Sequence, residues 1–141
     1  IYIQQGIDIY IYDSSEGKET ELIVYKFSSQ CKGLYYVKTD SRQHPNLKVY
    51  NIFREFGGSL MYEYLWICSD SLRWSQSVLE SINNYMEREY DIIIPNYRDV
   101  EKIGIREYVD KDSLFLDCAW HMTLFGATIL KTSSMLEWVD W

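Results

Sequence analysis

Residues 7–38 read IDIYIYDSSEGKETELIVYKFSSQCKGLYYVK, and this stretch decides the class of fold. Within 7–12, isoleucine stands at every second position, and a period of two predicts a strand. Residues 13–18 supply the Asp, Ser and Gly that are typical of turns, and apolar residues then return in 20–27 and in 34–38. Three short strands joined by turns predict an antiparallel N-terminal meander.

The hydrophobic period changes after a polar loop at 40–46. Apolar residues within 49–56 follow helical spacing, and Gly57-Gly58 is typical of the end of a helix. The apolar and aromatic residues of 59–68 then predict a buried strand.

The longest predicted helix covers 70–90. Ser69 or Asp70 is its expected N-cap, and one apolar stripe follows its length. The three isoleucines within 91–95 predict a short buried strand or a packed extension, which ends at Pro95.

The C-terminal part of the chain carries two competing patterns. Residues 103–109 predict a strand that turns at 110–112, and residues 114–125 alternate with a period of two. That alternation favours a long strand, while a helix over 114–125 stays open as the alternative. We therefore expect a single α+β domain over residues 1–141. Its mainly antiparallel sheet, made of the N-terminal meander and C-terminal strands, packs against one long central helix and one or two short helices.

The composition combines many aromatic residues with an acidic balance. The chain has 13 Tyr, 5 Trp and 5 Phe, and its formal net charge is −7. Aromatic side chains dominate protein interfaces, whereas a negative charge repels nucleic acid and attracts basic proteins. The basic segment 31–56 is the one argument for nucleic-acid binding, and the overall charge opposes it. We expect no direct nucleic-acid partner.

Membrane insertion and secretion are not expected. The longest apolar stretch, 114–130, is interrupted by polar and charged residues and is shorter than the roughly 20 residues of a membrane span. The N-terminal residues lack the basic and apolar regions of a signal peptide. The odd set Cys31, Cys68 and Cys118 favours a reducing, cytoplasmic compartment, with each cysteine as a small buried side chain.

The candidate catalytic residues are Asp117, Cys118 and His121. A cysteine beside a histidine can be activated as a thiolate. In a strand Cys118 and His121 point to opposite faces, whereas a helix brings His121 close to both Asp117 and Cys118. A small cytosolic enzyme therefore requires the helical alternative. The favoured strand predicts structural roles for these residues and no catalytic site.

Metal and cofactor sites are not predicted. Cys31, His44, Cys118 and His121 are residue types that bind zinc, but they lack the closely spaced pairs of structural zinc sites. The glycine pair at 57–58 follows a predicted helix rather than opening one, so it does not indicate a phosphate-binding loop.

Acidic residues adjoin aromatic residues in three clusters that we predict to bind a partner. The clusters are Tyr108, Asp110 and Asp112; Glu89, Tyr90 and Asp91; and Glu137, Trp138 and Asp140. Carboxylates raise the rate of encounter with a cationic surface, and buried aromatic residues hold the complex. Small acidic immunity proteins and phage-encoded inhibitors of nucleases or other nucleic-acid enzymes are similar in composition, without a shared motif. We expect a non-enzymatic protein that masks a basic protein partner. The alternatives are the small enzyme and a subunit of a larger assembly.

Overall fold

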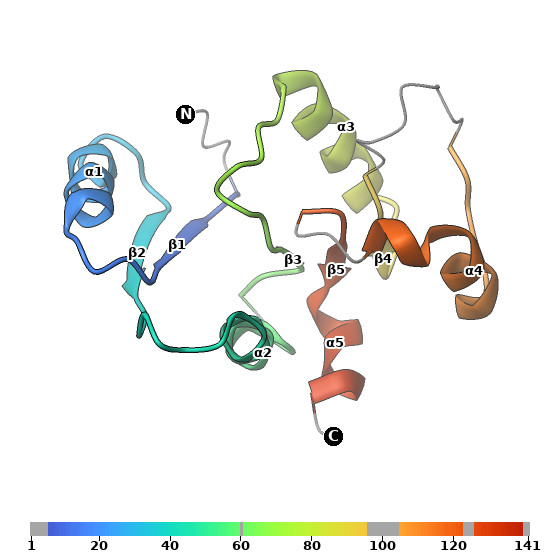
Figure 1. Cartoon of the computed structure of the whole chain (residues 1–141). Helices are drawn as coiled ribbons and strands as arrows, with labels where there is room; N and C mark the ends of the chain where they lie inside the picture. The colour runs from blue at the N-terminus through green and yellow to red at the C-terminus, as the bar shows by residue number, and fades with distance from the viewer. Residues whose placement is uncertain (1–5, 60, 96–104, 123–125, 140–141) are drawn as a thin grey trace. The chain divides into compact units, whose positions relative to one another are not determined.

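The computed structural model describes residues 6–59, 61–95, 105–122 and 126–139, with the backbone alone for 120–121 and 136–139. Helices and strands are mixed along these residues, so the predicted α+β class is confirmed (Figure 1). The elements in chain order are β1 (Ile9–Asp13), α1 (Glu19–Ser28), β2 (Leu34–Lys38), α2 (Pro45–Phe56), β3 (Tyr64–Trp66), α3 (Gln76–Met86), β4 (Ile92–Ile93), α4 (Lys111–Met122), β5 (Ile129–Lys131) and α5 (Thr132–Val139).

The chain divides into two compact units. They are Ile1–Tyr50 and Asn51–Trp141, and the boundary between them falls inside α2. The single domain over residues 1–141 stays a prediction.

The first unit is a β–α–β arrangement rather than the predicted meander. β1 and β2 pair in parallel, from Ile9 opposite Leu34 to Asp13 opposite Lys38. Parallel strands need a long crossover connection, usually a helix, and α1 supplies it here. The second strand predicted at 20–27 is therefore wrong, and so is the antiparallel pairing.

The charged residues at the two ends of α1 favour a helix, whereas its hydrophobic pattern does not distinguish a helix from a strand. Glu19 and Glu21 stand in its first turn and Lys26 in its last, as the helix dipole favours. All four residues of 22–25 are apolar, and such a run fits a strand as well as a helix. Val24 is the buried residue of the helix.

The second unit holds a three-stranded antiparallel sheet in the order β3-β5-β4. Ile129, in the central strand β5, is fully buried. The strand predicted at 59–68 is present only as β3, three residues long. The short strand predicted at 91–95 is confirmed as β4.

The helix predicted within 49–56 is confirmed as α2. It buries Ile52 and Phe56. The glycine pair ends it, since the Gly57 N–H donates to the Phe53 carbonyl at 2.7 Å and Gly58 takes a left-handed φ of 68°.

The long helix predicted at 70–90 is shorter in the structure. α3 begins at Gln76, and the hydroxyl of Ser75 caps it by accepting from the Val78 N–H at 3.4 Å. The residues before this cap pack outside the helix, as the Trp74 ring does against Trp66 with centroids 4.5 Å apart. A cap five or six residues further along the chain than expected explains the later start, and the helix also ends earlier, at Met86.

The strand predicted at 114–125 is wrong over the described residues, which form the helix α4; residues 123–125 lie outside the description. The Asp110 carboxylate accepts the Ser113 N–H at 2.8 Å, and this capping bond starts the helix. The strand predicted at 103–109 is absent from its described part, 105–109, which joins no sheet. No helix in the described ranges combines the length and apolarity needed to cross a bilayer.

Candidate functional site

One face of α4 exposes two large apolar side chains beside an acid. Asp112, Phe115 and Leu116 are spaced i, i+3 and i+4, which places them on one face of the helix. Phe115 is 63% exposed and Leu116 is 84% exposed, and Asp112 is exposed as well. We call these three residues the outer face of α4. Adjacent apolar side chains left in solvent are typical of an interaction surface.

The other side of α4 is less exposed to solvent. Leu114 and Cys118, at i and i+4, are both half-buried. Apolar residues therefore stand on both sides of α4, a pattern typical of a helix that is covered on both sides. The structure covers one of these sides within the described residues and leaves the outer face in solvent.

Two acids near the start of α4 have different surroundings. Hydrogen bonds from Ser113, led by its backbone N–H, lower the pKa of Asp110, so this carboxylate is ionised and serves the helix as its cap. Asp112 is exposed on the outer face. A charge change at Asp112 therefore tests electrostatics without removing the cap.

The segment 105–109 leads into α4 and is tied to it by one carboxylate. The Tyr108 hydroxyl donates to Asp117 Oδ2 at 2.8 Å, and Arg106 Nη1 lies 3.4 Å from the same oxygen. The hydrogen bond to Asp117 raises the pKa of Tyr108, which keeps the phenol protonated as a donor.

Glu107, between Arg106 and Tyr108, points away from Asp117. Glu107 Oε1 lies 3.4 Å from Arg88 Nη1 and accepts a hydrogen bond from the Tyr90 hydroxyl. Arg88 in turn lies over the ring of Tyr85, with 5.8 Å between its guanidinium carbon and the ring centroid. The end of α3 and the residues after it thus hold the segment from one side, and α4 holds it from the other.

The chain matches no protein-family model, no curated protein and no solved structure. Any function must therefore be argued from the residues themselves.

Two of the three predicted partner-binding clusters meet at the segment 105–109. Tyr90, from the second cluster, bonds to Glu107, and Tyr108, Asp110 and Asp112 of the first cluster lie in or directly after the segment. Glu89 is exposed with a left-handed φ of 58°.

The remaining predicted binding residues lie away from the segment 105–109 or have side chains that the structure does not describe. Asp91 is exposed and accepts a hydrogen bond from the Ser134 hydroxyl. Glu137 and Trp138 belong to α5, where the backbone alone is described, and Asp140 lies outside the described residues. Their part in binding stays a prediction.

The helical form of α4 satisfies the spacing that the enzyme alternative requires. Asp117 and His121 are four residues apart in one helix, although the side chain of His121 is not among those described. The Cys118 sulfur lies 4.0 Å from the Tyr108 hydroxyl, and the Asp117 carboxylate is engaged by Arg106 and Tyr108. The enzyme therefore stays a prediction, with Asp117 already holding two other side chains.

The cysteines differ from the expectation that each is buried. Cys31 and Cys118 are half-buried and Cys68 is exposed, and all three are free thiols. Among the described side chains, no three of His, Cys, Asp and Glu lie close enough together to hold a metal ion.

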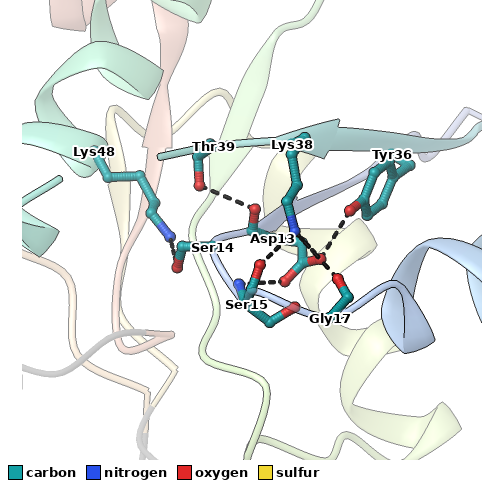
Figure 2. Close-up of polar contacts among 8 residues, drawn as sticks. All are labelled: Asp13, Ser14, Ser15, Gly17, Tyr36, Lys38, Thr39 and Lys48. Carbon is teal, nitrogen blue, oxygen red and sulfur yellow. Dashed lines mark hydrogen bonds and ion pairs between the residues drawn. The ribbon is translucent and has the colours of Figure 1, made fainter. Parts of the chain in front are cut away.

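A second polar cluster, in the first unit, lies where the parallel strands end. Asp13, at the end of β1, is 7% exposed (Figure 2). Its carboxylate accepts from the Ser15 N–H and the Tyr36 hydroxyl, each at 2.8 Å, and Lys38 Nζ lies 3.3 Å away. Lys48 donates to the Ser14 hydroxyl at 2.8 Å.

These bonds fix the charge of the cluster. The hydrogen bonds from Ser15, followed by those from Tyr36 and Lys38, hold the pKa of Asp13 well below its ordinary range. Partial burial and the bond to Asp13 raise the pKa of Tyr36 to about 12. Lys38 also donates to the carbonyls of Ser15 and Gly17, which closes the β1–α1 connection over the end of β2 (Figure 2). The carboxyl ends of parallel strands often bind ligands, but here both carboxylate oxygens are occupied by groups of the chain itself.

Sequence reasoning missed both arrangements for the same reason. A meander leaves Asp13 in a turn and gives it no partner on β2, and a strand at 114–125 sends Phe115 and Leu116 to opposite faces. The signal that was available is the pattern of capping and end charges, with Asp110 three residues before Ser113 and Glu19 opening α1.

Proposed function

We propose that the chain is a non-enzymatic binding protein that docks a basic protein partner on the outer face of α4 and masks it. The observation that carries the proposal is the exposure of Phe115 and Leu116 on one face beside Asp112. Apolar side chains in the centre of such a contact exclude water, and a neighbouring carboxylate selects a cationic surface.

Charge supports the choice of partner. The chain carries 21 acids against 14 Lys and Arg, so its net charge of −7 steers a basic protein toward it. Asp110 and Asp112 stand on either side of Lys111 at the start of α4, so acids outnumber bases next to Phe115 and Leu116. A partner that presents Lys or Arg around an apolar centre complements this arrangement.

The proposal places the protein in the cytoplasm, where an odd set of cysteines is kept reduced. Masking of a nuclease or of another nucleic-acid enzyme fits the same charge argument, because such enzymes carry basic surfaces for phosphate.

A pull-down from the native host, eluted with a salt gradient and read by mass spectrometry, tests the proposal. We expect one basic protein, released as salt rises, because exposed charge pairs are screened. Phe115→Ser with Leu116→Ser should abolish its recovery. Retention of the same protein by this double variant would contradict docking on the outer face of α4.

Charge is tested separately with a matched pair of reversals. Asp112→Lys should slow association with the recovered protein on the order of threefold or more, with less effect on dissociation. Asp70→Lys changes the charge equally at another exposed acid of the same unit and should have a smaller effect. Equal slowing by both variants would show that net charge acts without a local site.

A further inference from the structure

The segment 105–109 is held in an extended form by side chains that alternate in direction. Arg106 and Tyr108 both reach Asp117 on α4, whereas Glu107 between them reaches Arg88. Alternation from residue to residue is the geometry of a β-strand. Figure 1 shows the segment as an extended trace that leads into α4.

The backbone of this segment is unpaired within the described part of the chain. None of the N–H or C=O groups of 105–109 makes a bond to another described backbone group, in contrast to Asp110, whose carbonyl accepts the Leu114 N–H. A strand with open edges is a template for the backbone of another chain. The two outer residues, Ile105 at 70% exposure and Val109, fully exposed at the bend before α4, offer apolar contacts at the two ends of the segment.

We infer that the segment 105–109 binds an extended, lysine- or arginine-bearing segment of the partner by strand addition. This inference rests on the proposed function, of which it describes the mode of binding. Backbone hydrogen bonds supply affinity, and alternate side chains of the added strand supply specificity. The chemistry of the occupant follows from the residues after the segment, where Asp110 and Asp112 flank Lys111 and leave an excess of negative charge that favours cationic side chains on the added strand.

The test uses hydrogen exchange on the full ¹⁵N-labelled chain with a defined probe. The probe is an acetylated and amidated heptapeptide of alternating lysine and valine, titrated to millimolar concentration. Successive amides of a strand point to opposite edges, so strand addition protects either 106 and 108 or 105, 107 and 109. We expect exchange at one of these sets to slow by about tenfold or more, with the other set unchanged.

Two controls separate backbone pairing from attraction by charge. The same peptide, methylated on two neighbouring central amides, keeps its charge and loses a donor on each edge, so it should give no alternating protection. Val109→Pro removes one N–H of the segment and should weaken protection if the 105, 107 and 109 edge is used, whereas Val109→Thr should not. Val109 is fully exposed, so neither substitution disturbs the core.

The outcomes are distinguishable from those of the proposed function. Protection of neither set, or of all five amides equally, overturns strand addition even where the pull-down recovers a basic protein. Alternating protection without peptide, together with dimers in sedimentation, identifies a second copy of the chain as the occupant and overturns the basic partner. If the peptide protects alternate amides but the pull-down recovers no basic protein, strand addition is supported and the proposed partner is contradicted.

Discussion

Truncation of a large aliphatic side chain to alanine should strongly destabilise the centre of the β3-β5-β4 sheet and leave the stability almost unchanged on the outer face of α4. Ile129→Ala and Leu116→Ala each remove three carbon atoms from a side chain. Ile129 is fully buried, so the transfer cost is about 2.4 kcal/mol at about 0.8 kcal/mol per carbon, and the cavity raises it to about 3–4 kcal/mol. Leu116 is 84% exposed, so the same truncation should change the free energy of unfolding by less than about 0.5 kcal/mol.

Urea unfolding followed by tryptophan fluorescence measures both variants. Trp66 pairs with Ile129 in register and packs on Trp74, so the signal reports the unit that holds both substitutions. A loss of about 3 kcal/mol lowers the urea midpoint by about 1–3 M, a shift that Leu116→Ala should not show. A midpoint for Leu116→Ala as low as that of Ile129→Ala would refute the exposure of the outer face. It would also refute the docking argument, which needs Leu116 in solvent.

Three further variants test the polar groups. Asp13→Asn should lower the stability of the first unit at neutral pH and remove the loss of stability that the native chain shows below about pH 4. A carboxyl whose pKa is lowered by folding stabilises the fold above its unfolded-state pKa, and this stability is lost as the pH falls. Unfolding followed by NMR from pH 7 to pH 2 measures the effect. Tyr36→Phe should remove the tyrosine that titrates at about 12 from the absorbance curve at alkaline pH, and an unchanged curve would contradict its bond to Asp13. Asp110→Ala should reduce the helical circular dichroism of α4, whereas Asp110→Asn, which keeps an oxygen acceptor for the Ser113 N–H, should preserve it.

The elements predictable from sequence are those in which one local signal has no competitor. The helix over 49–56 combines helical spacing with the glycine pair, and the strand at 91–95 combines an apolar run with a proline. Both are present, as α2 and β4. In 22–25 every residue is apolar, so periodicity cannot choose, and the choice comes from the parallel pairing of β1 with β2.

The candidate site also contains features that are visible in the local sequence and features that depend on the tertiary fold. Asp110 and Asp112 were candidates from the sequence, since acids near aromatic residues are visible in the chain itself, and their part in binding stays a prediction. The outer face of α4 was not visible in the sequence, because the exposure of Phe115 and Leu116 depends on which side of the helix the rest of the chain covers. The bonds from Arg106 and Tyr108 to Asp117 depend on a chain reversal between segments, which one sequence does not specify.

Prior ordering of the segment 105–109 should decide how tightly it binds an added strand. A segment that is already extended loses little conformational entropy on binding, so the bonds to Asp117 favour affinity without contacting the peptide. Asp117→Ala removes both bonds and should weaken the lysine–valine peptide by about three- to tenfold. Asp117→Asn keeps an acceptor for Tyr108 and loses only charge, so its deficit should vanish at high salt while that of the alanine variant persists. Equal deficits in the two variants at high salt would show that Asp117 acts on the peptide by charge or contact, and not through the ordering of the segment.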